Sequence, residues 1–223
     1  MLKKYILSFV VASLFFASAF SQDNMNNIRL GIIANPNVSW LKSDVSRIQG
    51  DGSRIGFNIG LMVDKFFAEH YAFTTGLSIH SIGGTLKYRD EKVLNASSED
   101  YILPAGSRVQ YNLQYLHIPW GLKFKTTEIG YTTFFGQLGV NTMINIKARA
   151  NVKGQNISKE GVGEEINLFY MGYHFSGGVE YKIVGNTALI LGVTYMNGFT
   201  DITQKSDEKT LMHCFEIRLG VVF

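Results

Sequence analysis

Apolar and polar side chains alternate along most of the chain, and the last segment shows this pattern with little interruption. One face of the segment 211–223 is apolar and ends on an aromatic ring: Phe215, Ile217, Leu219, Val221 and Phe223. Glu216 and Arg218 lie between these residues, so the opposite face carries both charges. A side-chain period of two is that of a β-strand. The pattern predicts a strand with one apolar and one charged face.

Most of seven earlier segments repeat this rule, with large apolar residues on one face and Gly, polar or charged residues on the other. The predicted strands cover residues 28–38, 54–66, 71–88, 110–126, 131–148, 166–182, 187–200 and 211–223. After residue 21, no apolar run approaches the ~18 residues of a spanning helix. Because lipid cannot satisfy open sheet edges, strands span a membrane only as a closed barrel. The sequence predicts an all-β fold, an eight-stranded antiparallel up-and-down transmembrane β-barrel.

The first residues have the layout of a secretory signal peptide. Lys3 and Lys4 precede an apolar run, and small residues around Phe20 offer a cleavage site. We therefore expect a signal peptide over 1–21 and an outer-membrane β-barrel domain over 22–223. The terminal Phe223 resembles the assembly signal of outer-membrane barrels, which predicts the barrel-assembly machinery as a partner and the outer membrane as the location.

A soluble, lipocalin-like barrel is the alternative arrangement of the same eight strands. Its apolar faces would point inward, and charges such as Lys123, Glu216 and Arg218 would face water. The signal peptide and the terminal aromatic favour the membrane barrel, in which outer-membrane lipid covers the apolar faces.

The connections between the predicted strands alternate in length, as they do in outer-membrane barrels. Three are tight: 67–70, 127–130 and 183–186. Four are long and polar: 39–53, 89–109, 149–165 and 201–210. Aromatic residues gather at both strand ends, with Phe66, Phe67, Tyr71, Phe73, Phe124, Phe134, Tyr181 and Phe223 below and Trp40, Tyr111, Tyr170, Tyr195 and Phe199 above. We expect these rings at the two lipid–water boundaries, with the tight turns and both termini in the periplasm.

Charge and cysteine content narrow the possible partners. The chain has 21 basic and 18 acidic residues, and loss of Lys3 and Lys4 leaves 19 basic ones, a net charge of about +1. Neither this balance nor any block of Lys and Arg indicates a nucleic-acid partner. The single Cys214 excludes an internal disulfide and is expected to be a buried apolar residue.

The fourth predicted strand carries a family resemblance. Its residues 114–123 read Gln-Tyr-Leu-His-Ile-Pro-Trp-Gly-Leu-Lys, and the run Tyr-Leu-x-Ile-Pro-x-x-x-Lys resembles the signature strand of the PorT-type outer-membrane β-barrel family. The stretches 56–61, 71–77 and 217–221 are also similar to that family. The resemblance implies the barrel fold and the outer-membrane location. The founding member of the PorT-type family belongs to a secretion apparatus. Pro119 removes a ladder donor, so we expect a β-bulge there.

Three histidines fall in the inward phase at a similar height: His80, His117 and His174. Three imidazoles converging in a lumen could bind Zn²⁺. They are equally what a barrel needs as polar filler that satisfies its own hydrogen bonds. We take the second interpretation and predict neither a metal nor a cofactor.

Charged residues are also expected inside the barrel: Asp64, Lys123, Lys125, Glu180, Lys182, Glu216 and Arg218. They could form a constriction that selects anions, or an ion-pair network that plugs the lumen. At eight strands the interior is just wide enough for side chains to fill it. We therefore predict a plugged lumen, with a narrow pore or small-solute-binding barrel as the alternative.

A lipid-modifying enzyme of the outer membrane is a further alternative. Ser78 with His80, or the neighbouring Ser81, would supply a nucleophile and a base, but the spacing offers no acidic orienter. We therefore predict no catalytic residues. The expected function is that of a non-enzymatic outer-membrane β-barrel protein with an envelope structural, partner-binding or secretion-accessory role, whose long loops could bind other envelope or secretion proteins.

Overall fold

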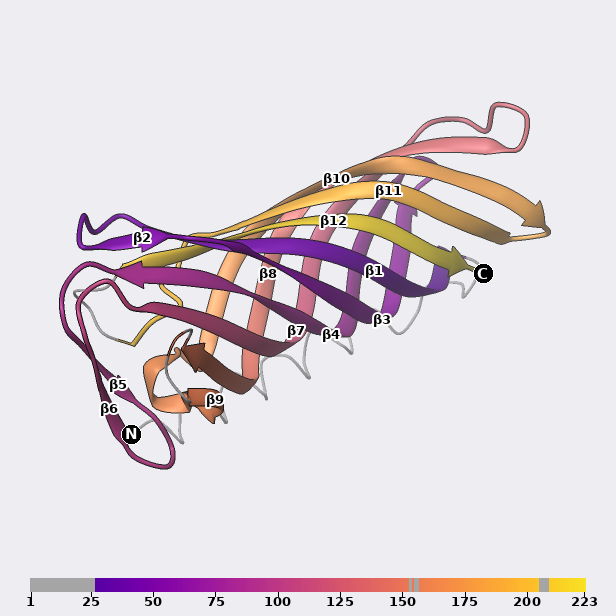
Figure 1. The fold of residues 1–223 in the computed structure, drawn as a ribbon. Coiled ribbons are helices and arrows are strands. Elements are labelled where there is room, and N and C mark those ends of the chain that lie inside the picture. Colours follow the sequence, from indigo (N-terminus) through magenta and orange to yellow (C-terminus); the bar gives the residue numbers. More distant parts are fainter. Residues whose placement is uncertain (1–26, 153, 155–156, 205–208) are drawn as a thin grey trace, which may run out of the picture.

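The computed structural model describes residues 27–152, 154, 157–204 and 209–223, so the predicted signal peptide lies outside the described part. Eight long strands form the barrel: β1 (Ile28–Ser43), β3 (Ser53–Ala68), β4 (Tyr71–Tyr88), β7 (Arg108–Lys125), β8 (Thr132–Val152), β10 (Phe169–Val184), β11 (Thr187–Gly198) and β12 (Thr210–Val222). Each strand pairs antiparallel with the next, and β12 pairs with β1 to close the ring. The predicted eight-stranded up-and-down barrel is confirmed (Figure 1).

The last residue takes part in the closure. Phe223 and Leu30 exchange two backbone hydrogen bonds, of 3.0 and 2.8 Å, and the side chain of Phe223 stays exposed on the outer wall.

Most predicted strands match the observed strands within three residues at each end. The exceptions are β1 and β8, which run on to Ser43 and Val152, beyond the predicted ends at 38 and 148.

The outer wall carries the apolar face of the closing strand. Ile217, Leu219 and Val221 are 46%, 39% and 36% exposed, whereas Glu216 and Arg218 are 3% and 7% exposed inside the barrel. A soluble barrel would show the reverse. Lipid is the solvent that suits such a wall, because it accepts apolar side chains and excludes the ionic ones.

The two ends of the barrel differ. The short turns and the C-terminus lie at one end, here called the turn end; the long connections lie at the other, the loop end (Figure 1). These connections add short elements that the sequence did not predict: β2 (Ile48–Gly50), the hairpin of β5 (Lys92–Asn95) and β6 (Asp100–Leu103), β9 (Ile157–Gly161) and the 3-10 turn η2 (Gly163–Glu165). No helix in the described part of the chain is long and apolar enough to cross a membrane.

The hydrophobic pattern inverts toward the loop end on β4, β7 and β8. The inward side chains there are apolar and buried: Ile82, Leu86, Tyr88, Val109, Tyr111, Leu113, Tyr115, Ala148, Ala150 and Val152. The outward residues of β7 become Gln114, Asn112 and Gln110. Beyond the lipid the outer face meets water, so the barrel acquires a dry interior there. The lumen is thus mainly polar toward the turn end and mainly apolar beside β4, β7 and β8 at the loop end.

This inversion corrects two positions in the predicted aromatic girdle. Tyr111 and Tyr170 were expected at the lipid–water boundary, yet they are 1% and 2% exposed inside the barrel. Their strands place them in the inward phase, where the apolar core encloses their rings. Phe124, Phe134 and Tyr181 are exposed on the outer wall as expected.

A β-bulge sits on β8 rather than at Pro119. Pro119 pairs in register with Asn141, whereas the register shifts where Gln114 faces Lys147 and Tyr115 faces Asn145, which leaves Ile146 unpaired. An extra residue in one strand reverses the phase of all that follow. Strict alternation along 131–148 would put Lys147 on the inward face with Gln137 and Asn145, but the bulge turns it outward.

We expect Ile217→Arg to destabilise the barrel by about 2–4 kcal/mol, because it places a guanidinium in lipid near the middle of the wall. The matched change Ile55→Arg, at an 80% exposed site near the loop end, should cost about 0–1 kcal/mol. Urea unfolding in lipid vesicles, followed by the mobility shift of folded barrel on gels, measures both. Equal costs would contradict the membrane assignment of this face.

Candidate functional site: the polar half of the lumen

Inward side chains of all eight barrel strands fill the turn-end half of the lumen. They form two layers, an ionic cluster near the turn end and a histidine layer above it. The sequence expected both groups inside the barrel, and the structure brings their members into contact.

Lys123 is the centre of the ionic cluster. Its Nζ lies 2.6 Å from Asp64 Oδ2 and 2.6 Å from Glu180 Oε1, and the side chains of Lys123 and Asp64 are completely buried. Thr74 donates to the other oxygen of Asp64 at 2.6 Å. One ammonium thus joins β3, β7 and β10 across the lumen.

Glu180 gathers two more cations. Arg29 NH1 and Lys125 Nζ both lie 2.7 Å from its Oε2. Lys182, which was expected in the same interior, is exposed at the rim and pairs instead with Glu128 of the β7–β8 turn at 3.1 Å. Lys182 lies two residues beyond Glu180, close to the end of β10 at the turn end, so its side chain reaches water.

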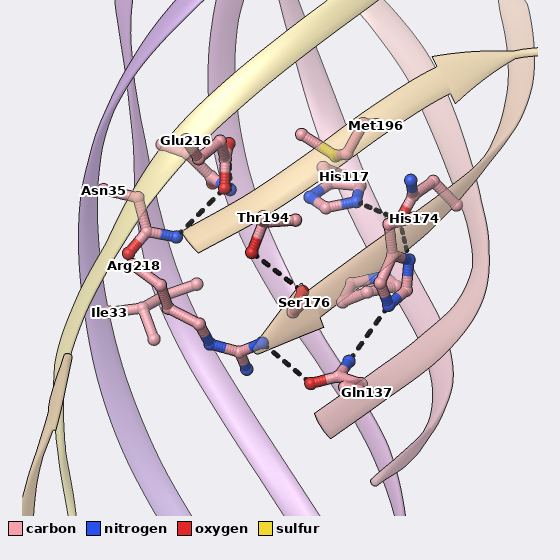
Figure 2. A pocket seen from close by; sticks show the side chains of 13 residues that line it. Ile33, Asn35, His117, Gln137, His174, Ser176, Thr194, Met196, Glu216 and Arg218 are labelled. Atoms are coloured by element: carbon pink, nitrogen blue, oxygen red, sulfur yellow. Dashed lines mark hydrogen bonds between the residues drawn. The ribbon is translucent and has the colours of Figure 1, made fainter. Parts of the chain in front are cut away.

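The histidine layer is a chain of hydrogen bonds across the barrel (Figure 2). Arg218 NH1 donates to Gln137 Oε1 at 2.7 Å, and Gln137 Nε2 lies 3.0 Å from His174 Nε2. Asn141 Oδ1 lies 2.9 Å from His174 Nδ1 and 3.0 Å from His117 Nε2. Arg218 thereby sets the direction of the whole chain, since a guanidinium can only donate.

The direction of these bonds assigns two tautomers. Asn141 Oδ1 can only accept, so His174 carries its proton on Nδ1 and His117 on Nε2. His174 Nε2 then accepts from the Gln137 amide, and His117 Nδ1 accepts from Ser78 Oγ at 3.2 Å. Both rings are fully engaged as neutral imidazoles, which leaves no nitrogen for Zn²⁺.

The third histidine pairs with the closing strand. His80 Nε2 lies 2.9 Å from Glu216 Oε1, and Asn58 and Asn35 each donate to this carboxylate at 3.2 Å. Cys214 Sγ lies 3.9 Å from the same imidazole nitrogen. His80, Cys214 and Glu216 have the ligand types of a zinc site within 4.8 Å. Because the nitrogen and both carboxylate oxygens already have protein partners, the arrangement suits structural cross-linking.

The serines do not form the nucleophile–base pairs with His80 that the enzyme alternative would require. Ser78 contacts His117 instead, and Ser81 points outward, where it accepts from Gln114 at 3.3 Å. Ser78, His117 and Asn141 resemble a nucleophile, base and orienter, but Ser78 is buried in the barrel. The adjoining cavity of about 40 Å³ has room for a few waters at most.

Phe135 is an inward residue that the sequence reading missed. The Lys123 ammonium lies 5.1 Å from the centroid of its ring, and the Arg218 guanidinium lies 5.6 Å from it. The same ring therefore contacts both cations. Cation–π attraction compensates part of the cost of burying them. Phe135 lies two residues before the inward-facing Gln137 on β8, and this spacing could have identified it as an inward residue.

A second candidate region is the cap at the loop end, formed by β5, β6, β9 and η2. Lys92 pairs with Glu165 at 3.0 Å, and both are buried. Glu165 also accepts from the backbone N–H of Asn95, at 3.0 Å. The outer side of the hairpin exposes the cross-strand pair Val93 and Ile102. The cap is therefore anchored from within and carries an exposed apolar pair on its outer side.

A known family matches this architecture. The model of the outer membrane protein beta-barrel domain covers residues 20–204. The chain belongs to this family. Membership implies the outer membrane as its location. The PorT-type resemblance is finer than this match and remains a prediction.

Several solved barrels are similar to the chain at low sequence identity. Neisserial surface protein A is 14% identical, with 88% of this chain and 96% of that chain covered and a TM-score of 0.49. OprG of Pseudomonas aeruginosa is 15% identical over 88% and 94%, with a TM-score of 0.47. The protease OmpT of Escherichia coli is 7% identical over 89% and 96%, with a TM-score of 0.43. No curated protein matches the chain in sequence.

We expect Glu180→Gln to destabilise the barrel by about 3–5 kcal/mol, because it leaves Arg29, Lys123 and Lys125 without their shared carboxylate. The matched change Glu128→Gln breaks the exposed pair with Lys182 and should cost less than about 1 kcal/mol. Urea unfolding in vesicles compares the two. A small cost for Glu180→Gln would contradict the ionic plug.

We expect nitrogen NMR of the folded protein in micelles to show His117 as the Nε2–H tautomer and His174 as the Nδ1–H tautomer. His117→Gln and His174→Gln variants assign the signals. The reversed tautomers, or a charged ring at neutral pH, would contradict the hydrogen-bond direction that Arg218 imposes.

Proposed function

We propose that this chain is a non-enzymatic outer-membrane barrel that acts by presenting its cap to a protein partner in the cell envelope. The observation that carries the proposal is the sealed lumen. Lys123, Asp64 and Glu180 cross-link the turn-end half, and an apolar core fills the loop-end half. Among the described residues, the cavity beside the histidine layer has a volume of only about 40 Å³, which favours the outer surface as the functional part.

The cap has the properties of a binding surface. Leu94 and Leu103 anchor the hairpin in the apolar core, and the Lys92–Glu165 pair ties it to the next long connection. Val93 and Ile102 then stand in water on a preorganised base, which lowers the entropy lost on binding. The resemblance of residues 114–123 to a PorT-type strand adds a specific partner class to the proposal, a secretion apparatus.

We expect a photoreactive amino acid at position 102 to cross-link to a discrete protein partner in native outer membranes. The same amino acid at position 183, which is similarly exposed but lies at the turn end, should give no such product. Val93→Asp with Ile102→Asp should abolish the partner's recovery while the barrel still folds, because both changes lie in water.

The proposal fails if position 102 gives no product, or if the double variant recovers the partner as well as the wild type. Planar-bilayer recording provides a second check. A closed lumen predicts no sustained ohmic conductance, and a stable conductance would favour the pore instead.

A further inference from the structure

Beyond the cap, the outer wall at the loop end has a cleft with an unusual charge. It has a volume of about 310 Å³ and lies on the side of β7 and β8, with the start of β3 beside it. Four cations line it: Arg54, Lys147, Arg149 and Lys159. The other lining residues are amides: Asn112, Gln114 and Asn151. None of the described lining residues is acidic.

These four cations lack the carboxylate partners that other cations of the barrel have. Arg29, Lys92, Lys123 and Lys125 each contact an acid. Among the described residues, no carboxylate lies within 4.0 Å of the charged atoms lining the cleft. Glu160, next to Lys159, instead accepts from Ser98 at 2.9 Å. Like charges gathered within a Debye length repel one another, and a bound anion would relieve this repulsion.

The bulge at Ile146 creates the cleft. Without it, Lys147 and Arg149 would point into the apolar core; with it, they point outward beside Gln114 and Asn112, their cross-strand partners. Side chains two apart on a strand are separated by roughly 7 Å, a spacing that lets two cations flank one phosphate. The neighbouring amides can donate to its oxygens.

Backbone contacts fix the walls of the cleft. Arg54 NH1 donates to the carbonyl of Ile82 at 2.7 Å, which holds the guanidinium against β4. Lys159 has a φ of 59°, and its N–H donates to Asn151 Oδ1 at 2.6 Å. The Arg54 guanidinium and the backbone of Lys159 are thereby held in place at the edge of the cleft.

The height of the cleft on the wall identifies the anion. The exposed apolar side chains of β8 run from Phe134 to Ile146, and Lys147 follows at once. At ~3.4 Å per residue and a tilt of about 45°, that run spans roughly 28 Å, close to the height of a barrel's lipid-facing band. The cleft therefore begins where the hydrocarbon ends, at the level of lipid headgroups.

We propose that this cleft binds a phosphate group of an outer-leaflet lipid, with Arg54, Lys147 and Arg149 as its principal ligands. Arginine suits the role because its planar fork engages two phosphate oxygens at once. The apolar wall below the cleft, including Ile146, would contact the acyl chains of the same molecule. One lipid would thus be held at both its headgroup and its tails.

Native mass spectrometry of the folded barrel in neutral detergent tests the proposal, with diphosphoryl lipid A as the probe. The variant Arg54→Gln/Lys147→Gln/Arg149→Gln should retain this lipid roughly tenfold less than the wild type. The control Lys42→Gln/Lys182→Gln/Lys209→Gln removes the same charge from exposed sites outside the cleft and should retain it fully. Gel mobility confirms that both fold, and Arg149→Gln alone serves if the triple variant does not.

Two further probes separate the sources of phosphate. Monophosphoryl lipid A should bind more weakly, and inorganic phosphate at equal concentration should not displace the bound lipid, because it lacks the acyl contacts. Equal retention by the cleft variant and the control would overturn the proposal. Displacement by inorganic phosphate would also overturn it, since the cleft would then recognise a soluble anion.

Discussion

The strands of this barrel form a wall one residue thick, and the solvent outside that wall decides which side chains can face it. Where lipid is outside, every second residue must be apolar, and the others turn inward whatever their charge. Where water is outside, the constraint reverses and the interior becomes dry. Both regimes occur along β4, β7 and β8 of the same barrel. The remaining features of the structure follow from this switch.

In the membrane-spanning part, charge is forced into a lumen too narrow to hydrate it. The chain meets this cost by pairing: Lys123 lies between Asp64 and Glu180, and Glu180 also holds Arg29. Arg218 has amide and aromatic partners instead, Gln137 and Phe135. Many of these polar side chains bond one another, but His80 Nδ1 and Arg218 Nε are buried without a hydrogen-bond partner among the described residues. Their residue types would suit metal binding or catalysis, but in this barrel most of their polar atoms contact one another.

In the part beyond the membrane, the apolar interior supports a rigid cap and the outer wall becomes free for polar groups. The bulge at Ile146 makes the transition abrupt on β8, because it reverses the phase within one residue. The cations beyond it gather on the outer wall at headgroup height. The proposed partner-binding surface of the cap and the proposed lipid cleft thus both lie at the loop end of the barrel.

The sequence by itself determined the strand count, the phase of each strand in the membrane and the inward position of His80, Glu216 and Arg218. It could do so because a period of two is a local property of the backbone, readable from consecutive residues. The short elements of the long connections, the outward turn of Lys147 and the apolar interior around Tyr111 and Tyr170 were decided by tertiary structure. Each of these features depends on a distant strand or on the solvent at that height of the barrel. Neither of these two factors can be read from the neighbouring residues. The same holds for His117 and His174, whose shared level was predictable but whose bonds to Asn141 required the register between β7, β8 and β10.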